Sequence, residues 1–192
     1  NLMPIEHCRP LHVFDADKVN GDIRARMAKD GEKLLALDGK EYQLDGEITV
    51  IADQNAAESI GGVMGGEASG CTDETTEMFL EAALFDAHRT AATGRRLGIE
   101  SDARYRFERG VDPAMVQPGV EVATRMVLEI CGGETSHTVM AGTPEGPAKV
   151  VGFRPARVTE LIGIDVDEAE QRKILSDLGF GISGEGDKWQ VT

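Results

Sequence analysis

The segment TEMFLEAALF, residues 76–85, constrains the fold more than any other part of this sequence. Successive side chains of a β-strand point to opposite faces, and both faces of this segment are mainly apolar. Such a strand is expected to be covered on both sides, which predicts a layered protein. One face carries Met78, Leu80, Ala82 and Leu84, and the other carries Phe79, Glu81, Ala83 and Phe85.

Glu81 is the one charged residue between Met78 and Phe85. A buried carboxylate is costly unless it is paired or hydrogen-bonded, so two interpretations stay open. In the first, Glu81 forms a structural ion pair with Arg106 or Arg109. In the second, it lines a pocket and accepts a hydrogen bond from a ligand hydroxyl. A site built on such a bond rejects the analogue that lacks the hydroxyl by about 10⁴ to 10⁵.

The charge balance bears on nucleic-acid binding. The chain has 192 residues, with 20 Lys and Arg against 34 Asp and Glu, a net charge of -14. Phosphate contacts supply most of the affinity of nucleic-acid-binding proteins, so a free-standing binder is disfavoured. A mixed run of charges is usually a solvated face with internal ion pairs, although a local basic edge is the alternative. The clustered arginines are Arg89, Arg95, Arg96, Arg104, Arg106 and Arg109.

Neither the cysteines nor the apolar runs indicate export. Cys8, Cys71 and Cys131 are odd in number and scattered, which argues against a disulfide framework and fits a reducing cytoplasm. Cys8, His7 and His12 lack the paired spacing of a zinc site, so no metal is predicted. No apolar run approaches the roughly 20 residues of a membrane span, and no signal peptide opens the chain. We expect a cytoplasmic protein, and the missing initiator Met suggests a piece of a larger one.

Turn and cap signals predict the elements of the first part. Residues 23–52 should form strands, with a hairpin at Asp38-Gly39. Asp86 should cap a helix that Gly98 ends. Pro118 should open the main helix at its first position.

A linker and a second unit follow. Residues 143–150 are rich in Pro and Gly. Beyond them we expect a helix after Pro155, a second helix capped by Asp165 with Glu168, and a hairpin over residues 180–191. The predicted fold class is α+β: a layered, mostly antiparallel β-sheet body with helices packed on one side, followed by a small truncated α/β unit.

Two further features suggest a site. The run IGGVMGGEASG, residues 60–70, brings bare backbone close to a neighbour, either for tight strand packing or as the wall of a pocket. It lacks the G-x-x-x-x-G-K spacing of a phosphate loop. His12, in RPLHVFD, is more typical of a core residue, although a histidine pKa suits water positioning near neutral pH. No Ser-His-Asp, Cys-His or G-x-S-x-G pattern favours covalent catalysis.

Three long strings carry a family resemblance: PLHVFDADKV, GGVMGGEASGCTDETTEMFLEAALFD and GRRLGIESDARYRFERGVDP, with ICGGE after them. Their order and spacing resemble the beta chain of bacterial phenylalanyl-tRNA synthetase, over essentially the whole sequence. Residues 1–143 resemble the third and fourth modules, which form the editing domain of that family. Residues 148–192 resemble the N-terminal part of the fifth module.

The resemblance implies a fragment of a phenylalanine-tRNA ligase. That family joins phenylalanine to tRNA-Phe with ATP and magnesium, as a heterotetramer of two alpha and two beta chains. The aminoacylation site belongs to the alpha chain, so this fragment needs no cofactor of its own. Its implied activity is hydrolysis of tyrosine misattached to tRNA-Phe.

The resemblance also implies the site residues, none of them a metal ligand. Glu81 would receive the para-hydroxyl of tyrosine, and His12 would lie beside the scissile ester; these are the catalytic candidates. Small residues and a glycine wall would complete the pocket. The other substrate-binding candidates are Asn1, Gly62, Gly65, Ser101 and Ala103.

Two positions depart from the family pattern, and two other functions compete. The family commonly has Thr at Ser101 and Ser at Arg104, and the bulky Arg104 could alter the pocket mouth. A non-catalytic scaffold or tRNA-docking module that has lost editing is the main alternative. A small-molecule-binding domain unrelated to tRNA is a third. The presence of Glu81, His12 and Ala103 favours editing.

Overall fold

The computed structural model describes residues 10–143 and 149–192. The chain divides into two compact units, residues 1–145 and 146–192. Most of the predicted linker, residues 143–150, lies outside the described residues. The first unit contains the candidate site.

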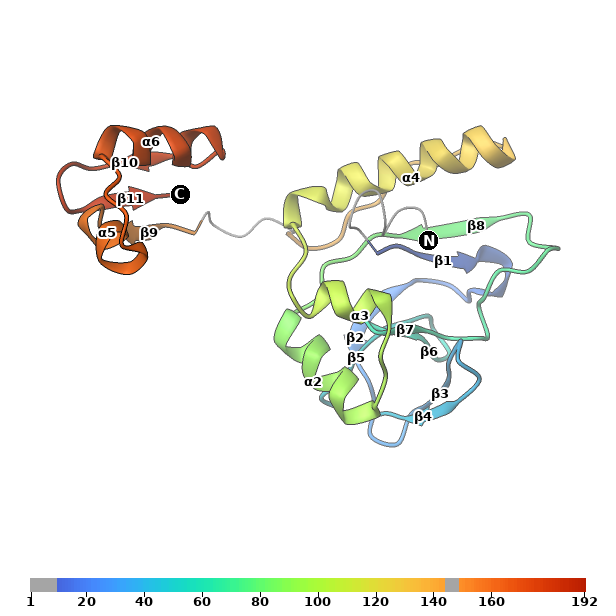
Figure 1. Cartoon of the computed structure of the whole chain (residues 1–192). Helices are drawn as coiled ribbons and strands as arrows, with labels where there is room; N and C mark the ends of the chain where they lie inside the picture. The colour runs from blue at the N-terminus through green and yellow to red at the C-terminus, as the bar shows by residue number, and fades with distance from the viewer. Residues whose placement is uncertain (1–9, 144–148) are drawn as a thin grey trace. The chain divides into compact units, whose positions relative to one another are not determined.

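Antiparallel sheets build the first unit (Figure 1). The largest has the strand order β2-β5-β6-β7, while β3 pairs with β4 and β1 pairs with β8. The last pair joins two segments that are far apart in the sequence. The strands are β1 His12–Asp15, β2 Arg24–Met27, β3 Lys33–Leu35, β4 Glu41–Gln43, β5 Thr49–Ala52, β6 Ala57–Ile60, β7 Met64–Gly65 and β8 Met78–Glu81.

The strands and the hairpin predicted over residues 23–52 are confirmed by β2 to β5. The amide of Ala36 donates to the carbonyl of Lys40 at 2.9 Å, and the amide of Gly39 donates back to Ala36 at 2.8 Å. Gly39 has φ +76°, a left-handed conformation that glycine adopts without steric cost. The Asp38-Gly39 pair therefore sets the turn as its sequence predicts.

The prediction that the whole of residues 76–85 is a doubly covered strand is wrong. β8 ends at Glu81, and Met78 and Phe79 are each 40% exposed. The reason is that β8 belongs to a two-stranded sheet with β1 as its partner. After Glu81 the chain leaves the sheet, and Phe85 packs against the glycine-rich turn. Leu84 is 40% exposed, so the apolar pattern of this second half does not mark a doubly covered strand.

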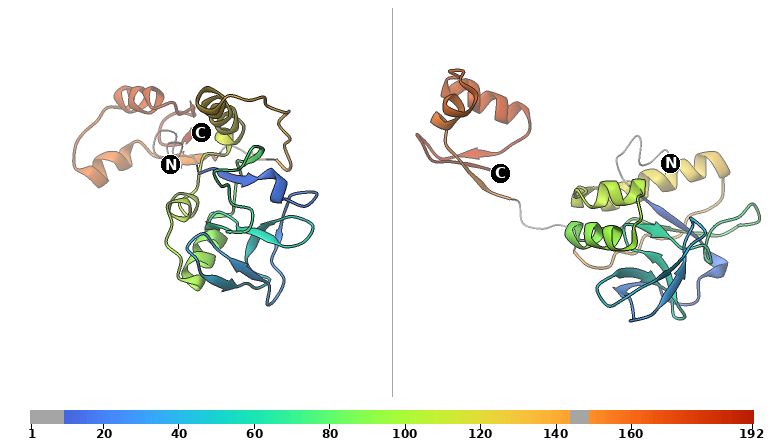
Figure 2. Two further views of the ribbon diagram at one scale, coloured as in Figure 1. Left: turned by 90° about the vertical axis from the view of Figure 1, so that its right-hand side faces the viewer. Right: turned by 60° about the horizontal axis from the view of Figure 1, so that its bottom comes forward.

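In the first unit, α2 and α3 flank the strands, and α4 lies along β8 (Figure 1 and Figure 2). Asp86 caps α2 by accepting the amide of Arg89 at 2.7 Å, and Gly98 ends it in a left-handed conformation, as predicted. Pro118 does not open α4, because α4 begins at Val116, directly after a 3₁₀ turn. Pro118 is tolerated there because the amides of a first helical turn have no intrahelical acceptor. The elements are η1 Ala16–Lys18, α2 Ala87–Leu97, α3 Asp102–Phe107, η2 Pro113–Met115 and α4 Val116–Cys131.

The core of the first unit lies between the four-stranded sheet and the β3-β4 hairpin. Its side chains are closely packed, and Leu97 of α2 covers one edge. The glycine-rich turn contributes Val63, which is almost fully buried. This packing anchors the turn that borders the candidate site. The largest members are Leu34, Leu44, Ile48, Val50, Ile60, Val63 and Ile99.

The second unit is a small antiparallel sheet with two helices. The predicted hairpin over residues 180–191 is confirmed, and Trp189 is fully buried within it. The predicted cap of the second helix is wrong by two residues. Asp167, rather than Asp165, accepts the amide of Glu170 at 2.8 Å. The elements are β9 Val151–Phe153, α5 Ala156–Ile162, α6 Glu168–Asp177, β10 Ile182–Ser183 and β11 Trp189–Val191, in the order β10-β11-β9.

Together the described elements confirm the predicted α+β class. Every sheet is antiparallel, and helices α2, α3 and α4 flank the strands of the first unit. The second unit combines a three-stranded sheet with α5 and α6.

Candidate functional site

The β1-β8 pair places His12 directly opposite Glu81. Directly opposed residues of an antiparallel pair point to the same face of the sheet, with Cβ atoms about 5 Å apart. Phe14 and Phe79 form the next pair on this face, and their ring centroids are 5.8 Å apart. The register therefore brings two side chains from distant parts of the sequence to one place.

His12 and Glu81 border a cavity of about 260 Å³. This volume is slightly below the roughly 300–1,000 Å³ of pockets for drug-sized ligands, so it suits a smaller group such as one side chain. Six of the predicted site residues line it: His12, Gly62, Gly65, Glu81, Ser101 and Ala103. Asn1, the seventh, lies outside the described residues, as do His7 and Cys8.

The rest of the cavity wall is mostly apolar. Phe85 and Phe107 meet at 5.1 Å between ring centroids in an edge-to-face arrangement. Sequence reasoning did not assign these rings to the site. The alternation of residues 79–85 held the signal, since Phe85 falls on the face that carries Glu81 and Ala83. The other lining residues are Pro10, Leu11, Leu37, Ser59, Ile60, Val63, Met64, Ala83 and Asp102.

One carboxyl oxygen of Glu81 has no hydrogen-bond partner among the described residues. This oxygen, Oε2, is also shielded from solvent. Burial raises the pKa of Glu81 from its ordinary 4.5 to about 7, because the charged form loses its hydration. Near neutral pH the group is therefore divided between its protonated and ionised forms.

Of the two interpretations of Glu81, the ion pair with Arg106 or Arg109 is not present among the described residues. Arg106 lies 3.7 Å from Asp102, and Arg109 pairs with Glu108 at 2.9 Å. Both arginines therefore pair with carboxylates that lie within residues 102–109. Glu81 thus keeps the properties of a pocket residue, which the second sequence interpretation had described.

His12 is half-buried, and its imidazole packs edge-to-face on Phe14 with ring centroids 4.3 Å apart. Burial lowers the pKa of His12 below its ordinary value of 6.5, because the imidazolium is the form that loses hydration. The neutral ring therefore dominates at pH 7. A neutral imidazole can accept a hydrogen bond through one nitrogen and donate one through the other.

The glycines of residues 60–70 allow neighbouring side chains to pack directly against the backbone beside the cavity. A Cβ on Gly65 would collide with the imidazole of His12 and come within 2.9 Å of Leu37 Cδ1. A Cβ on Gly62 would come within 2.9 Å of the Phe85 ring, and Gly62 also has φ +71°. Both interpretations of the run therefore hold at once, since tight packing here is also the wall of a pocket.

Ser101 ties α3 to the glycine-rich turn. Its hydroxyl donates to the carbonyl of Val63 at 2.5 Å and accepts the amide of Arg104 at 3.0 Å. Because its hydroxyl accepts the amide of Arg104, Ser101 is the N-cap of α3. Ala103 follows in the first turn of α3 and lines the cavity. The small side chain of Ala103 leaves the space open.

Arg104, the second departure from the family pattern, does not line this cavity. Its guanidinium donates to Glu108 Oε2 at 2.9 Å and to the carbonyl of Ile99 at 2.6 Å. It also packs over Gly94, where a Cβ would collide with it. Arg104 therefore fastens α3 to the end of α2 and leaves the cavity lining unchanged.

The comparison with family models matches residues 1–132 to the family described as "B3/4 domain". The chain belongs to this family. Its relatives are proteins called phenylalanine--tRNA ligase beta subunit. That of Paramagnetospirillum magneticum is 57% identical over 187 residues, which are 97% of this chain and 23% of the relative. Those of Bradyrhizobium diazoefficiens and Rhodopseudomonas palustris are each 52% identical over 186 and 185 residues.

These matches confirm the resemblance to the beta chain of phenylalanyl-tRNA synthetase. The chain spans only 23% of the length of the curated relatives it matches. A crystal structure of an N-terminal fragment of the phenylalanyl-tRNA synthetase beta-subunit from Pyrococcus horikoshii aligns with 99% of this chain and 56% of its own. The identity is 14% and the TM-score is 0.42.

Within residues 10–143 and 149–192, no three His, Cys, Asp or Glu side chains are grouped so that they could hold a metal ion. In the same described part, no helix has the length and apolarity to cross a membrane.

Proposed function

We propose that this chain is the editing part of a phenylalanine-tRNA ligase beta subunit and hydrolyses tyrosine misattached to tRNA-Phe. The observation that carries the proposal is Glu81: a carboxyl group with one buried, unpartnered oxygen at a small apolar cavity. A phenol hydroxyl is a suitable partner for such a group, and the aromatic ring suits walls made by Phe85, Phe107 and Ala103.

Selection between tyrosine and phenylalanine then depends on one hydrogen bond. A cavity that admits the tyrosine ring also admits the phenylalanine ring, so shape cannot exclude the cognate amino acid. With phenylalanine bound, Glu81 would be covered by an apolar ring and left without a partner, at the cost of an unsatisfied buried polar group. Tyrosine supplies a hydroxyl that accepts from the protonated carboxyl or donates to the carboxylate.

Hydrolysis in this proposal uses a positioned water. The neutral His12 imidazole accepts a hydrogen bond from a water beside the ester carbonyl, and the water oxygen attacks the carbonyl carbon. The bond to the ribose oxygen then breaks, and a proton from the water passes to that oxygen. The products are free tyrosine and tRNA with a free hydroxyl. Rate enhancement comes mainly from holding water and ester in reactive geometry.

The partners and cofactors of the complete enzyme belong to the same proposal. Residues 1–143 would be the paired third and fourth modules, and residues 148–192 the start of the fifth. The complete enzyme would be cytoplasmic and join two alpha and two beta chains, with ATP and magnesium used at the aminoacylation site of the alpha chain. No step derived for the present cavity involves either cofactor.

The test compares Glu81→Ala with the unaltered protein in the complete enzyme. Hydrolysis of Tyr-tRNA-Phe and Phe-tRNA-Phe is measured under single-turnover conditions. We expect the ratio of the two rates to fall toward one in the variant. An unchanged ratio in a less stable variant would make Glu81 a structural residue. Absence of hydrolysis by the unaltered enzyme would favour the alternative, a scaffold or tRNA-docking module that has lost editing.

A further inference from the structure

Tyr105 of α3 and Arg109, two residues after the end of α3, form an exposed pair. The guanidinium carbon of Arg109 lies 3.7 Å from the centroid of the Tyr105 ring. Tyr105 is 58% exposed, so much of the ring remains open although the guanidinium covers part of it. Large aromatic side chains usually bury most of their surface, which makes this exposure a feature that needs a reason.

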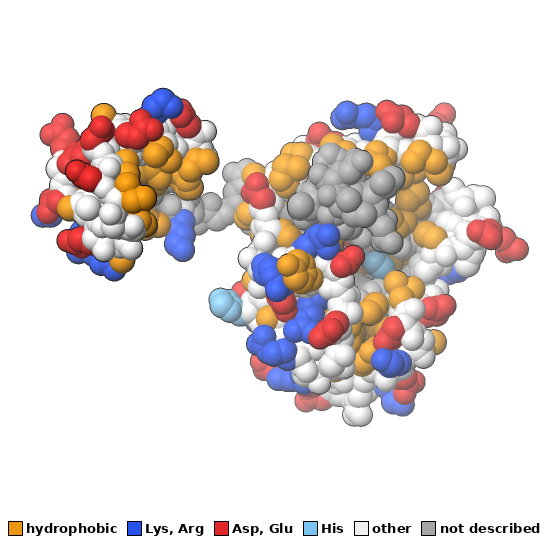
Figure 3. Space-filling view, in the orientation of Figure 1, with side chains coloured by type: hydrophobic (Ala, Val, Ile, Leu, Met, Phe, Trp, Pro, Cys, Tyr) orange, Lys and Arg blue, Asp and Glu red, His pale blue; other side chains and the backbone are white. Residues whose placement is uncertain are grey.

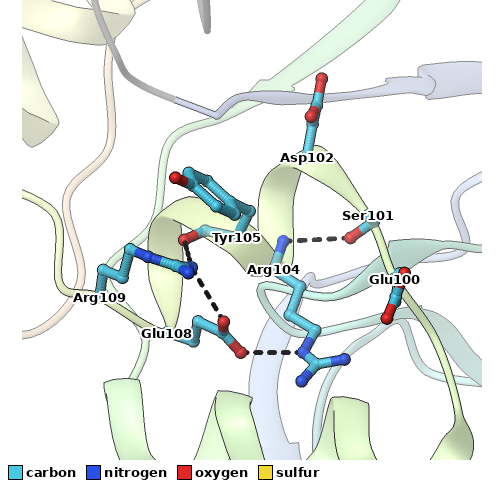
Figure 4. A pocket seen from close by; sticks show the side chains of 7 residues that line it. All are labelled: Glu100, Ser101, Asp102, Arg104, Tyr105, Glu108 and Arg109. Carbon is cyan, nitrogen blue, oxygen red and sulfur yellow. Dashed lines mark hydrogen bonds and ion pairs between the residues drawn. The ribbon is translucent and has the colours of Figure 1, made fainter.

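The pair is held in place before any ligand arrives. The guanidinium of Arg109 donates to the carbonyl of Tyr105 at 2.7 Å and to Glu108 Oε1 at 2.9 Å. Glu108 is fixed in turn by Arg104. Figure 4 shows these side chains gathered around α3 and its C-terminal end, with Tyr105 and Arg109 on the same side. A preformed surface of this kind loses little conformational entropy on binding.

This surface continues from the candidate site. A second hollow of about 480 Å³ lies over α3, and its lining includes Tyr105, Arg109, Ser101 and Asp102. Ser101 and Asp102 also line the cavity that contains Glu81. The side chain of Asp102 is 91% exposed, so it marks the rim that the two hollows share. Tyr105 follows one helical turn later, about 5 Å along the axis.

The charges of the hollow favour a neutral flat ring over a phosphate group. Lys and Arg side chains gather over α2 and α3 on the face shown in Figure 3, but acidic side chains lie among them. In the lining, Glu100, Asp102 and Glu108 oppose an anion, while Arg104 and Arg109 are already engaged by Glu108. A nucleobase can stack on tyrosine or on a guanidinium plane without a phosphate contact.

We propose that Tyr105 and Arg109 form a stacking platform for the terminal base of the RNA whose aminoacyl ester enters the Glu81 cavity. This inference rests on the proposed function. In it, the amino acid side chain occupies the cavity, the ribose crosses the rim at Asp102, and the base stacks on the open part of the Tyr105–Arg109 pair. The platform binds the base without touching the reacting atoms, so both residues are positioning residues.

The first test compares two substrates in the complete enzyme: Tyr-tRNA-Phe, and tyrosine ethyl ester, which has no base. Tyr105→Ala should raise KM for the tRNA substrate about 5- to 150-fold, the range expected for loss of one stacked base. Its kcat, and hydrolysis of the ethyl ester, should stay unchanged. Tyr105→Phe keeps the ring and should behave as the unaltered enzyme. An equal loss with both substrates, or no change in KM, would overturn the proposal.

The second test needs no hydrolysis and uses the 192-residue chain. An RNA hairpin that ends in an unpaired ACC followed by 2-aminopurine is titrated with protein, since stacking quenches the fluorescence of this base analogue. Quenching should be lost with Tyr105→Ala and kept with Tyr105→Phe. Quenching that does not depend on residue 105 would overturn the platform. Quenching that does depend on it, in a protein that hydrolyses neither ester, would refute the proposed function alone.

Discussion

The burial of Glu81 predicts a specific dependence of stability on pH. The folded-state pKa of about 7 stands above the ordinary value of 4.5 that applies to the unfolded chain. Between these pH values the folded state holds a proton that the unfolded state has released, so the free energy of unfolding falls as pH rises. One unit of pKa difference corresponds to about 1.4 kcal/mol, so the shift of Glu81 changes the free energy of unfolding by about 3 kcal/mol. This contribution is complete below pH 4.5 and lost above pH 7.

Glu81→Gln removes the titrating group while keeping the shape of the side chain. We expect the stability of the unaltered protein, minus that of the variant, to fall by about 3 kcal/mol between pH 4 and pH 8. The lowered pKa of His12 acts in the opposite direction, because protonation below pH 6.5 favours the unfolded state. His12 is present in both proteins, so its effect cancels in the difference.

The assay must report on unfolding of the first unit, and the position of the single tryptophan determines which spectroscopic signal does so. The single tryptophan of the chain, Trp189, belongs to the second unit. Urea unfolding followed by far-UV circular dichroism at fixed pH values includes the first unit, while Trp189 fluorescence follows the second and should not respond to the substitution. Glu77→Gln, which removes an exposed carboxylate just before β8, is the matched control. A difference that stays constant from pH 4 to 8 would show that Glu81 titrates normally and refute the reasoning.

Three other predictions concern the cavity, the glycine-rich turn and the affinity for tRNA. Ala103→Trp should fill the cavity and abolish binding of free tyrosine by calorimetry while the circular dichroism spectrum persists; unchanged affinity would place the pocket elsewhere. Gly65→Ala should destabilise the first unit by about 1–3 kcal/mol in urea unfolding, because its Cβ collides with His12, whereas Gly46→Ala in the same unit, where a Cβ would meet only Asp30 Oδ1 at an ordinary 3.5 Å, should not. The 192-residue chain alone should bind tRNA with a Kd no better than about 10⁻⁴ to 10⁻⁶ M, and tight, salt-resistant binding would contradict this.

Local signals in the sequence predicted the elements well where the residues concerned are close together. The Asp38-Gly39 turn and the Asp86 cap depend on contacts within a few residues, and both are confirmed. The cap of α6 was misplaced because Asp165 and Asp167 are both competent caps. The structure assigns Asp167 to the cap and leaves Asp165 as the acceptor from Thr159 at 3.4 Å.

Non-local features were harder to predict. The apolar pattern of residues 76–85 indicated burial on both sides but could not give the number of neighbouring strands. The ion pair considered for Glu81 is absent because Arg106 pairs with Asp102, one helical turn earlier, and Arg109 pairs with the adjacent Glu108. That spacing was visible in the sequence and favoured local pairs over a distant one.

The cavity itself follows from three constraints that no short segment contains. The β1-β8 register sets His12 against Glu81, the glycine-rich turn leaves room for His12 and Phe85, and the Ser101 hydroxyl fixes α3 to that turn through the Val63 carbonyl. The family resemblance identified His12 and Glu81 as candidates, and the strand register explains why the two side chains lie together.

The pKa of Glu81 also bears on how a pocket of this kind would discriminate across physiological pH. Below pH 7 the protonated carboxyl can donate a hydrogen bond to a phenol oxygen, and above pH 7 the carboxylate can accept one from the phenol hydrogen. Phenylalanine offers a partner to neither form. The penalty for an unpaired group is larger for the ionised form, because a buried charge costs more than a buried neutral dipole. The proposed preference for tyrosine should therefore persist from pH 6 to 8 and increase as pH rises through 7, which single-turnover rates on the two esters would measure. A preference that disappears above pH 7 would mean that only the protonated carboxyl recognises the hydroxyl.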